Sequence, residues 1–183
     1  MQLKKIVLFL ALIVATGSVF AQKKITTSAT IKFDATTSID DLAKAENKTV
    51  IGALNTKTGE IVFEANVKNF AFTNPTMQGH FNGPSWLDSD KHPSFTYKGN
   101  ITDLSAVNFT KDGTYQVKTE GILTIKGIDK KLVTPATITV KGGTISATAD
   151  FSIKLSDYGI TGSPIDGGKV AKEPKINVSA DLK

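Results

Sequence analysis

The sequence of 183 residues contains no cysteine and no arginine. Without cysteine there can be no disulfide, thiolate metal ligand, thiol nucleophile or lipid-modified thiol anchor, so stability must come from a packed core. Without arginine the chain lacks the planar, bidentate group that proteins favour for clamping phosphates, carboxylates and nucleobases. All 22 basic residues are lysines. We interpret them as a solvated exterior, and we expect no nucleic-acid partner.

Long apolar runs are also scarce. Lys4 and Lys5 precede a short apolar run at residues 6–14, and Val19-Phe20-Ala21 forms a small-residue cleavage site. Residues 1–21 are therefore predicted to be a secretory signal peptide. No segment reaches the roughly 20 apolar residues of a membrane-spanning helix. We therefore expect an exported protein, periplasmic or secreted, with no integral membrane segment. Residues 22–183 suit one domain.

Period-two alternation dominates the remainder of the chain. In the run from Glu60 to Lys68, for example, Ile61, Phe63 and Ala65 share one face and the glutamates share the other. The same pattern predicts strands at residues 25–33, 49–55, 60–68, 95–101, 115–125, 132–140, 145–155 and 176–182. Short Gly/Asp/Asn clusters between them suit hairpins. The expected fold is all-β and antiparallel, with about eight strands that either stack as two sheets or close into a barrel.

One helical segment interrupts the strands. Asn74-Pro75 is a favourable N-cap and first-turn pair, Met77 and Phe81 lie four residues apart on one helix face, and Asn82-Gly83 can end the helix. Residues 37–48 are ambiguous, because Asp40–Glu46 has helical propensity. The Gly- and Pro-rich segment from Gly159 to Pro174 is predicted to be the one long irregular connection.

The stretch His80–Phe95 gathers both histidines, the only tryptophan and two aspartates. Asp88, Asp90 and His92 alternate, but no two-histidine spacing typical of a zinc site is present. The aspartates could serve as acid and base for glycoside cleavage, yet paired aspartates in an exposed turn are commoner as turn formers. A hydrolase using them or His80 is therefore the least favoured hypothesis. We predict no metal site, no catalytic residue and no enzyme.

Aromatic residues are concentrated around this stretch. An eight-stranded barrel has an interior just large enough for packed side chains or for one small ligand. The inward positions also include many small residues: Ala29, Ala53, Ala65, Thr119, Gly121, Ala136, Ala147, Ala149 and Ala180. Small side chains along the barrel interior, with aromatic side chains near one mouth, leave room for an elongated apolar ligand. The alternative is a barrel that aromatic side chains fill completely.

Four segments of the chain, taken in order and with their spacing, resemble the YceI-like family of lipid- and polyisoprenoid-binding proteins. The segments are Met77–Phe81, Trp86–Ile101, Tyr115–Lys131 and Phe151–Ile160. The most specific parts are the Gly-x-Leu-Thr-x-x-Gly hairpin at 121–127 and the turn at 91–95. The resemblance covers nearly all of residues 22–183, which we assign to one YceI-like β-barrel domain.

This resemblance implies an exported, lipocalin-like, eight-stranded antiparallel barrel with one short helix near its mouth and a hydrophobic tunnel for an isoprenoid or fatty chain. The expected ligand-binding residues are Phe63, Val67, Phe70, Phe72, Met77, His80, Phe81, Trp86, Phe95, Tyr97, Leu123 and Phe151. His80 and Tyr97 are expected to hydrogen-bond a quinone or acid head group. No cofactor is expected beyond a bound isoprenoid quinone or fatty acid, and a homodimer stays open. The alternative function is a filled barrel that acts as a stress or interaction protein.

Overall fold

The alternating segments form nine β-strands in the computed structural model, which describes residues 22–183. The predicted signal peptide therefore lies outside the described residues. The strands are β1 (Lys23–Asp34), β2 (Lys44–Asn55), β3 (Glu60–Asn66), β4 (Ala71–Phe72), β5 (Ser94–Ile101), β6 (Gly113–Ile125), β7 (Ile128–Lys141), β8 (Thr144–Ser152) and β9 (Lys175–Leu182). Every pairing between them is antiparallel.

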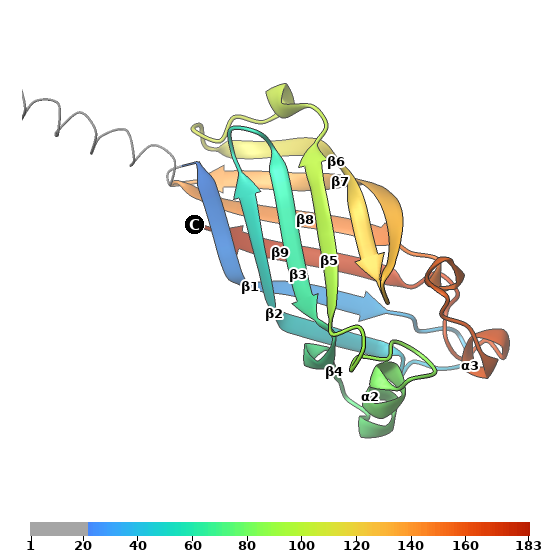
Figure 1. Cartoon of the computed structure of the whole chain (residues 1–183). Helices are drawn as coiled ribbons and strands as arrows, with labels where there is room; N and C mark the ends of the chain where they lie inside the picture. The colour runs from blue at the N-terminus through green and yellow to red at the C-terminus, as the bar shows by residue number, and fades with distance from the viewer. Residues whose placement is uncertain (1–21) are drawn as a thin grey trace, which may run out of the picture.

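The sheet closes on itself. Its order is β1-β9-β8-β7-β6-β5-β3-β2, and β2 pairs back to β1 from Lys23↔Asn55 to Asp34↔Lys44. Eight strands thus make a barrel, while the two-residue β4 is an extra strand beside β2 (Figure 1). The predicted eight-stranded antiparallel barrel is confirmed, and the open alternative of two stacked sheets is not adopted.

Two tight hairpins set the register of β6, β7 and β8. The turns are Lys126-Gly127, with φ of 53° and 72°, and Gly142-Gly143, with φ of 56° and 81°. Positive φ at both central residues is the geometry of a two-residue hairpin turn that matches the twist of the strands. Both turns fall in the Gly-rich clusters that predicted hairpins.

The ladder between β7 and β8 is short. It runs from Lys141↔Thr144 only to Thr137↔Thr148, although β7 continues along β6 as far as Ile128. The next pairing position on β7 is Pro135, which has no N–H to donate to β8. The Thr134 hydroxyl lies 3.5 Å from the free carbonyl of Asp150. β7 therefore separates from β8 beyond this point, and the barrel widens there.

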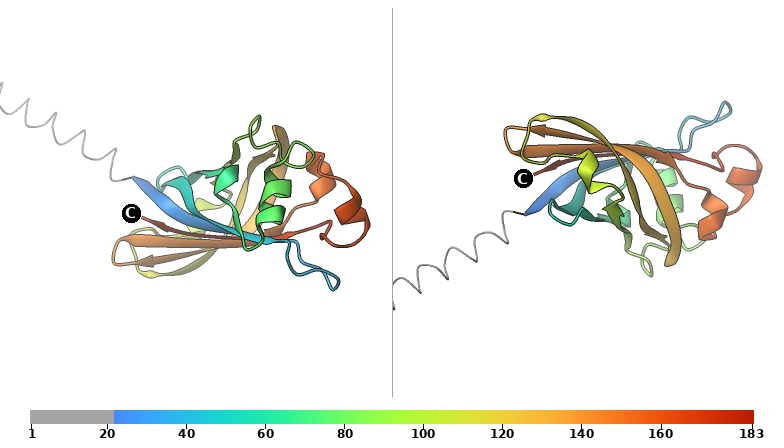
Figure 2. Two further views of the ribbon diagram at one scale, coloured as in Figure 1. Left: turned by 90° about the horizontal axis from the view of Figure 1, so that it is seen from below. Right: turned by 90° about the horizontal axis from the view of Figure 1, so that it is seen from above.

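Both α-helices lie at the wider end of the barrel (Figure 2), whereas the 3₁₀ turn at residues 104–106 lies at the opposite end. The α-helices are α2 (Pro75–Asn82) and α3 (Ser163–Asp166), and the 3₁₀ turns are η1 (Val67–Asn69), η2 (Leu104–Ala106) and η3 (Leu155–Tyr158). α2 begins as predicted: the Asn74 side chain accepts from Thr76 N at 2.9 Å, and Gly83 caps the other end. None of the helices between residues 22 and 183 combines the length and apolar character that a membrane span demands.

The ambiguous segment 37–48 contains no helix. β2 begins at Lys44 rather than at the predicted residue 49, because Ala45 pairs with Phe33 of β1 and with Phe72 of β4. Pairing on both sides overrides the local helical propensity. At the other predicted boundary, β8 ends at Ser152, and Leu155 begins η3 instead of extending the strand.

The barrel has two different ends. At the end that holds both chain-terminal strand ends, which we call the filled end, inward side chains pack solidly, each at most 6% exposed: Ile101, Val117, Val140 and Ile145. The opposite end carries α2, α3 and η3, and we call it the mouth end. The hydrophobic core extends to both ends, but the inside of the barrel is packed solidly at the filled end and is hollow toward the mouth end.

Candidate ligand site: a barrel cavity and a mouth hollow

An apolar cavity of about 170 Å³ occupies the barrel from its middle to the mouth end. We call it the barrel cavity. All eight barrel strands contribute side chains to it, and so do α2 and η3. Eight of the predicted ligand-binding residues line it: Phe63, Phe70, Phe81, Trp86, Phe95, Tyr97, Leu123 and Phe151. No charged side chain of residues 22–183 does so.

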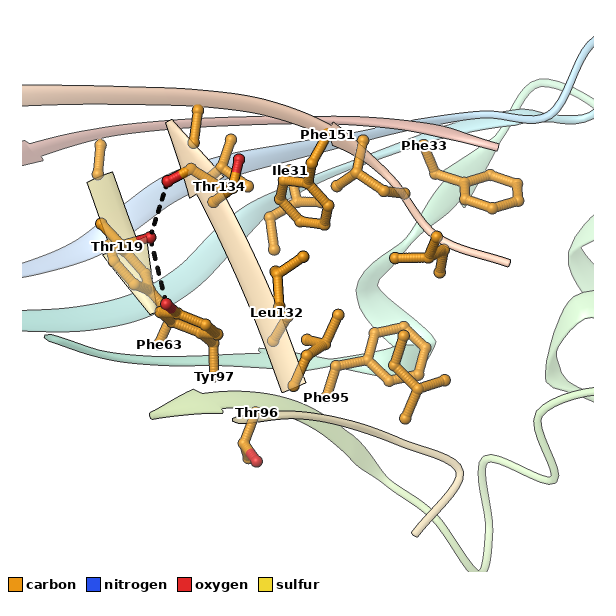
Figure 3. A pocket seen from close by; sticks show the side chains of 18 of the residues that line it. Ile31, Phe33, Phe63, Phe95, Thr96, Tyr97, Thr119, Leu132, Thr134 and Phe151 are labelled. Atoms are coloured by element: carbon orange, nitrogen blue, oxygen red, sulfur yellow. Dashed lines mark hydrogen bonds between the residues drawn. The ribbon is translucent and has the colours of Figure 1, made fainter. Parts of the chain in front are cut away.

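The hydroxyl groups in the barrel wall are bonded to one another. Tyr97 Oη donates to Thr119 Oγ1 at 3.2 Å, and Thr119 Oγ1 lies 3.4 Å from the carbonyl of Thr134 (Figure 3). Burial raises the pKa of the Tyr97 phenol, so its neutral form is the favoured one. These polar groups are satisfied by the protein, which leaves the cavity with an effectively apolar wall.

Glycines make space for the aromatic rings at the inner part of the cavity. A Cβ atom at Gly52 would lie 2.3 Å from Phe63 Cε1, and one at Gly99 would lie 2.6 Å from Tyr97 Oη. The two rings thus lie against bare backbone instead of crossing the barrel axis. Phe63 and Tyr97 are direct cross-strand partners on β3 and β5. This arrangement explains why aromatic residues line the cavity without filling it.

A second hollow, of about 310 Å³, lies outside the barrel cavity at the mouth end. We call it the mouth hollow. It lies between α2 and the segment that carries α3, and it includes the predicted residues Phe72, Met77 and His80. Phe33, Phe81 and Trp86 line both hollows and form an aromatic partition between them.

Phe81 is the centre of this partition. Its ring centroid lies 4.9 Å from that of Phe72 and 5.8 Å from those of Phe33 and Phe70, in tilted or edge-on arrangements. Such aromatic pairs add roughly 0.5–1.5 kcal/mol beyond the area that they bury. The ring is 5% exposed although α2 lies at the protein surface.

The Gln78 side chain fastens α2 to the barrel. Its amide nitrogen donates to the carbonyl of Phe70 at 2.7 Å, and its amide oxygen accepts from the N–H of Phe72 at 3.0 Å. One side chain thereby satisfies both backbone groups beside β4. Because Gln78 lies one helical turn before Phe81, this clamp fixes where the central ring of the partition sits.

Val67 is the one predicted ligand-binding residue that lines neither hollow. β3 ends at Asn66, so the alternation stops there, and Val67 begins η1 with no exposed surface. Tyr97 and His80, which were expected to act together on a head group, line different hollows. Ala53 shares the outer face of β2 with Ile51, which is 48% exposed, and so does not face inward.

Several lining residues were missed by the sequence analysis. Phe33 could have been found, because it continues the inward alternation of Ile31 along the first predicted strand. Residues 161–164 and Val170 could not, since they reach the mouth hollow from an irregular segment that has no periodic pattern.

The polar residues after Trp86 form turns and exposed ion pairs. Asp90 accepts from Lys68 Nζ at 2.6 Å, and Asp88 accepts from Lys91 Nζ at 2.8 Å. The hydrogen bond from Lys68 lowers the pKa of Asp90. His92 packs against the hairpin turn, 3.1 Å from where a Gly127 Cβ would lie. Within residues 22–183 no three such side chains are arranged to hold a metal ion.

Comparison with known proteins places this barrel in a family. The model of the YceI-like domain matches residues 14–182. Among curated proteins, none matches the chain. The described fold is similar to solved structures at low sequence identity, which shows that the fold is shared.

Three of these structures illustrate the likeness. BcnA of Burkholderia cenocepacia has a TM-score of 0.71 at 19% identity, over 85% of this chain and 96% of that one. A polyisoprenoid binding domain from Saccharophagus degradans, implicated in plant cell wall breakdown, has a TM-score of 0.75 at 13% identity, over 88% and 98%. The YceI protein of Campylobacter jejuni has a TM-score of 0.53 at 20% identity, over 74% and 81%. With nearly its whole length matched by the family model, the chain belongs to the YceI-like family.

Proposed function

We propose that this protein is an exported binding protein that holds the apolar chain of an isoprenoid or fatty lipid in its barrel. The observation that carries the proposal is the barrel cavity, whose wall presents no charged side chain of residues 22–183. The name of the Saccharophagus degradans domain, a polyisoprenoid binding domain, supports the same ligand class. Export to the periplasm or beyond is part of the proposal and rests on residues 1–21 of the sequence.

The size of the barrel cavity limits how much of a ligand it takes. A dry apolar cavity of about 150 Å³ accommodates a molecule of the size of benzene, and the barrel cavity measures about 170 Å³. Each buried methylene contributes about 0.8 kcal/mol, whereas association costs at least 4 kcal/mol or so. A useful affinity therefore needs more than five methylenes. A longer chain must extend past the aromatic partition into the mouth hollow.

A binding role fits the hollows better than catalysis does. Among the residues between 22 and 183 that line either hollow, the ionisable side chains are Tyr97 and His80, and they lie in different hollows. A general acid and a general base that act on one reacting bond must both lie within hydrogen-bond reach of it, and these two side chains do not share a hollow. The filled-barrel alternative would require the mouth end to be packed like the filled end, which is not the arrangement of Phe63 and Tyr97 over their glycines.

The experiment uses Trp86, the only tryptophan of the chain, which lines both hollows. Its fluorescence should shift on titration with an isoprenoid alcohol, and native mass spectrometry of protein purified from its own cell envelope should show a bound lipid. Ala136→Phe places a ring in the barrel cavity and should weaken binding at least tenfold. Ala53→Phe adds the same ring on the outer face and should leave binding unchanged.

The proposal fails if neither isoprenoids nor fatty chains alter Trp86 fluorescence and no lipid copurifies. It also fails if Ala136→Phe and Ala53→Phe bind equally well while both remain folded. Circular dichroism of each variant separates lost binding from lost structure.

A further inference from the structure

The polar side chains of the mouth hollow differ from those of the barrel wall. His80, Ser85, Thr161 and Ser163 line the mouth hollow, and within residues 22–183 their side chains take part in no hydrogen bond or ion pair of the protein. The barrel hydroxyl of Tyr97, by contrast, is bonded to Thr119. The mouth hollow therefore offers donors and acceptors that are available to a ligand, whereas the barrel cavity does not.

The charge of the mouth hollow is equally informative. Lysine is the only long cationic side chain in the sequence, with 22 copies, and among residues 22–183 none lines either hollow. Lys44 and Lys169 are the sequence neighbours of the lining residues Ala43 and Val170, but both are exposed and neither lines the hollow. His80, Ser85, Thr161 and Ser163 are exposed, so an anionic head group here would exchange only part of its water. It would gain no lysine in return, whereas an uncharged head replaces that water with equivalent hydrogen bonds.

We propose that the mouth hollow binds the uncharged, hydrogen-bonding head of an amphiphile, and that the protein thereby selects neutral amphiphiles over carboxylates and phosphate esters with the same chain. This inference rests on the proposed function, because the apolar chain must lie in the barrel cavity. The hydroxyl groups of Ser85 and Ser163 and the imidazole of His80 supply both donors and acceptors. A hydroxyl, amide or carbonyl head can exchange its water for these groups at little net cost.

The aromatic partition sets the geometry of such a ligand. Phe33 and Phe81 are buried and separate the two hollows. An amphiphile that occupies both must displace a ring, and Phe81 moves only if the Gln78 clamp on α2 yields. The head group thus stays on the side of α2 and α3, where the unpaired side chains are.

The test is a set of dodecyl compounds that share one chain and differ in the head: the alcohol, the primary amide, the carboxylate and the monophosphate. Binding is followed by Trp86 fluorescence and by calorimetry, below the micelle concentration of each compound, at 150 mM salt. The alcohol and the amide should bind at least tenfold more tightly than the two anions. Equal affinities, or tighter binding of an anion, would overturn the inference while leaving the proposed function standing.

If none of the four compounds binds, the proposed function fails, and the inference fails with it. A charge variant sharpens the result. Ser163→Lys places a cation in the mouth hollow and should raise carboxylate affinity at least tenfold, while the alcohol should bind somewhat more weakly because the Ser163 hydroxyl is lost. Ser105→Lys adds the same charge at the filled end, in η2, and should change neither. If Ser163→Lys leaves carboxylate binding unchanged, the head group does not occupy the mouth hollow.

Discussion

The same strands build both ends of this barrel, but side chains pack solidly at one end and surround a cavity toward the other. At the filled end, Val140 and Ile145 meet across the β7–β8 hairpin and are almost fully buried. At the mouth end, β7 has left β8 beyond Pro135, and Ile153 and Leu132 face a cavity instead of each other. The alternation that points a side chain inward therefore does not decide whether the interior is packed or hollow. Whether the interior is packed or hollow depends on where the aromatic rings lie and on how far β7 separates from β8.

The largest expected effect compares one residue type at both ends. Ile145→Ala should lower the free energy of unfolding by about 3–4 kcal/mol, since it leaves a void in packed surroundings. Ile153→Ala should cost only about 1 kcal/mol, because its side chain already borders a cavity and is only partly buried. Urea unfolding measures both. Equal costs would show that the mouth end is packed after all.

The next effect concerns the glycines that make the hollow. The Cβ of Gly121→Ala would lie 2.4 Å from the carbonyl oxygen of Lys98 and 2.5 Å from the Gly99 Cα, so β5 and β6 must move apart. We expect a loss of about 2–3 kcal/mol. Gly79→Ala is the control: its Cβ meets no atom within 4 Å and should be neutral or stabilising, since alanine favours a helix. A tolerated Gly121→Ala would contradict the close approach of the strands.

A smaller effect is expected from the clamp at the mouth end. Gln78→Ala removes the hydrogen bonds to Phe70 and Phe72 and should cost about 1–2 kcal/mol. Because α2 is then held less firmly, stopped-flow fluorescence of Trp86 should show ligand release accelerated about tenfold. Gln116→Ala removes an exposed amide that accepts from Thr137 and should leave the release rate unchanged. Equal release rates in the two variants would show that the hold on α2 does not control ligand release.

The smallest effect is a pH dependence at Tyr158, which η3 buries at the mouth end. Burial, aided by the Asp157 charge, raises the pKa of its phenol to about 12. An unfolded tyrosine ionises near pH 10, so the associated stability is fully present below pH 10 and is lost as the pH rises toward 12. Wild-type protein should lose more stability between pH 9 and 11 than Tyr158→Phe does, as measured by denaturant midpoints. Parallel losses would count against a buried phenol.

Much of the fold could be predicted from the sequence, because its determinants are local. Alternation located the barrel strands, the Lys126-Gly127 and Gly142-Gly143 turns fixed two hairpins, and Asn74-Pro75 started α2. The start of β2 could not be predicted, since it depends on pairing with residues from two other strands.

The candidate site was less accessible to sequence reasoning. The aromatic residues of α2 and the neighbouring strands were found from their density, and the small residues indicated space. Val67 was placed one residue beyond the end of its strand. The residues of the mouth hollow between 161 and 170 come together with His80 only through the tertiary fold, and the effect of Pro135 on strand separation depends on which of its backbone groups faces β8.

Pro135 also bears on the solubility of the protein. Where β7 leaves β8, its backbone is unpaired by any strand of residues 22–183 on that side, and an unpaired edge invites a strand from another molecule. The edge carries Asp129, Lys130 and Lys131, all exposed. An incoming strand would have to accommodate these charges along its length. The widening that creates room for a guest is thus accompanied by charges that discourage polymerisation through the same edge.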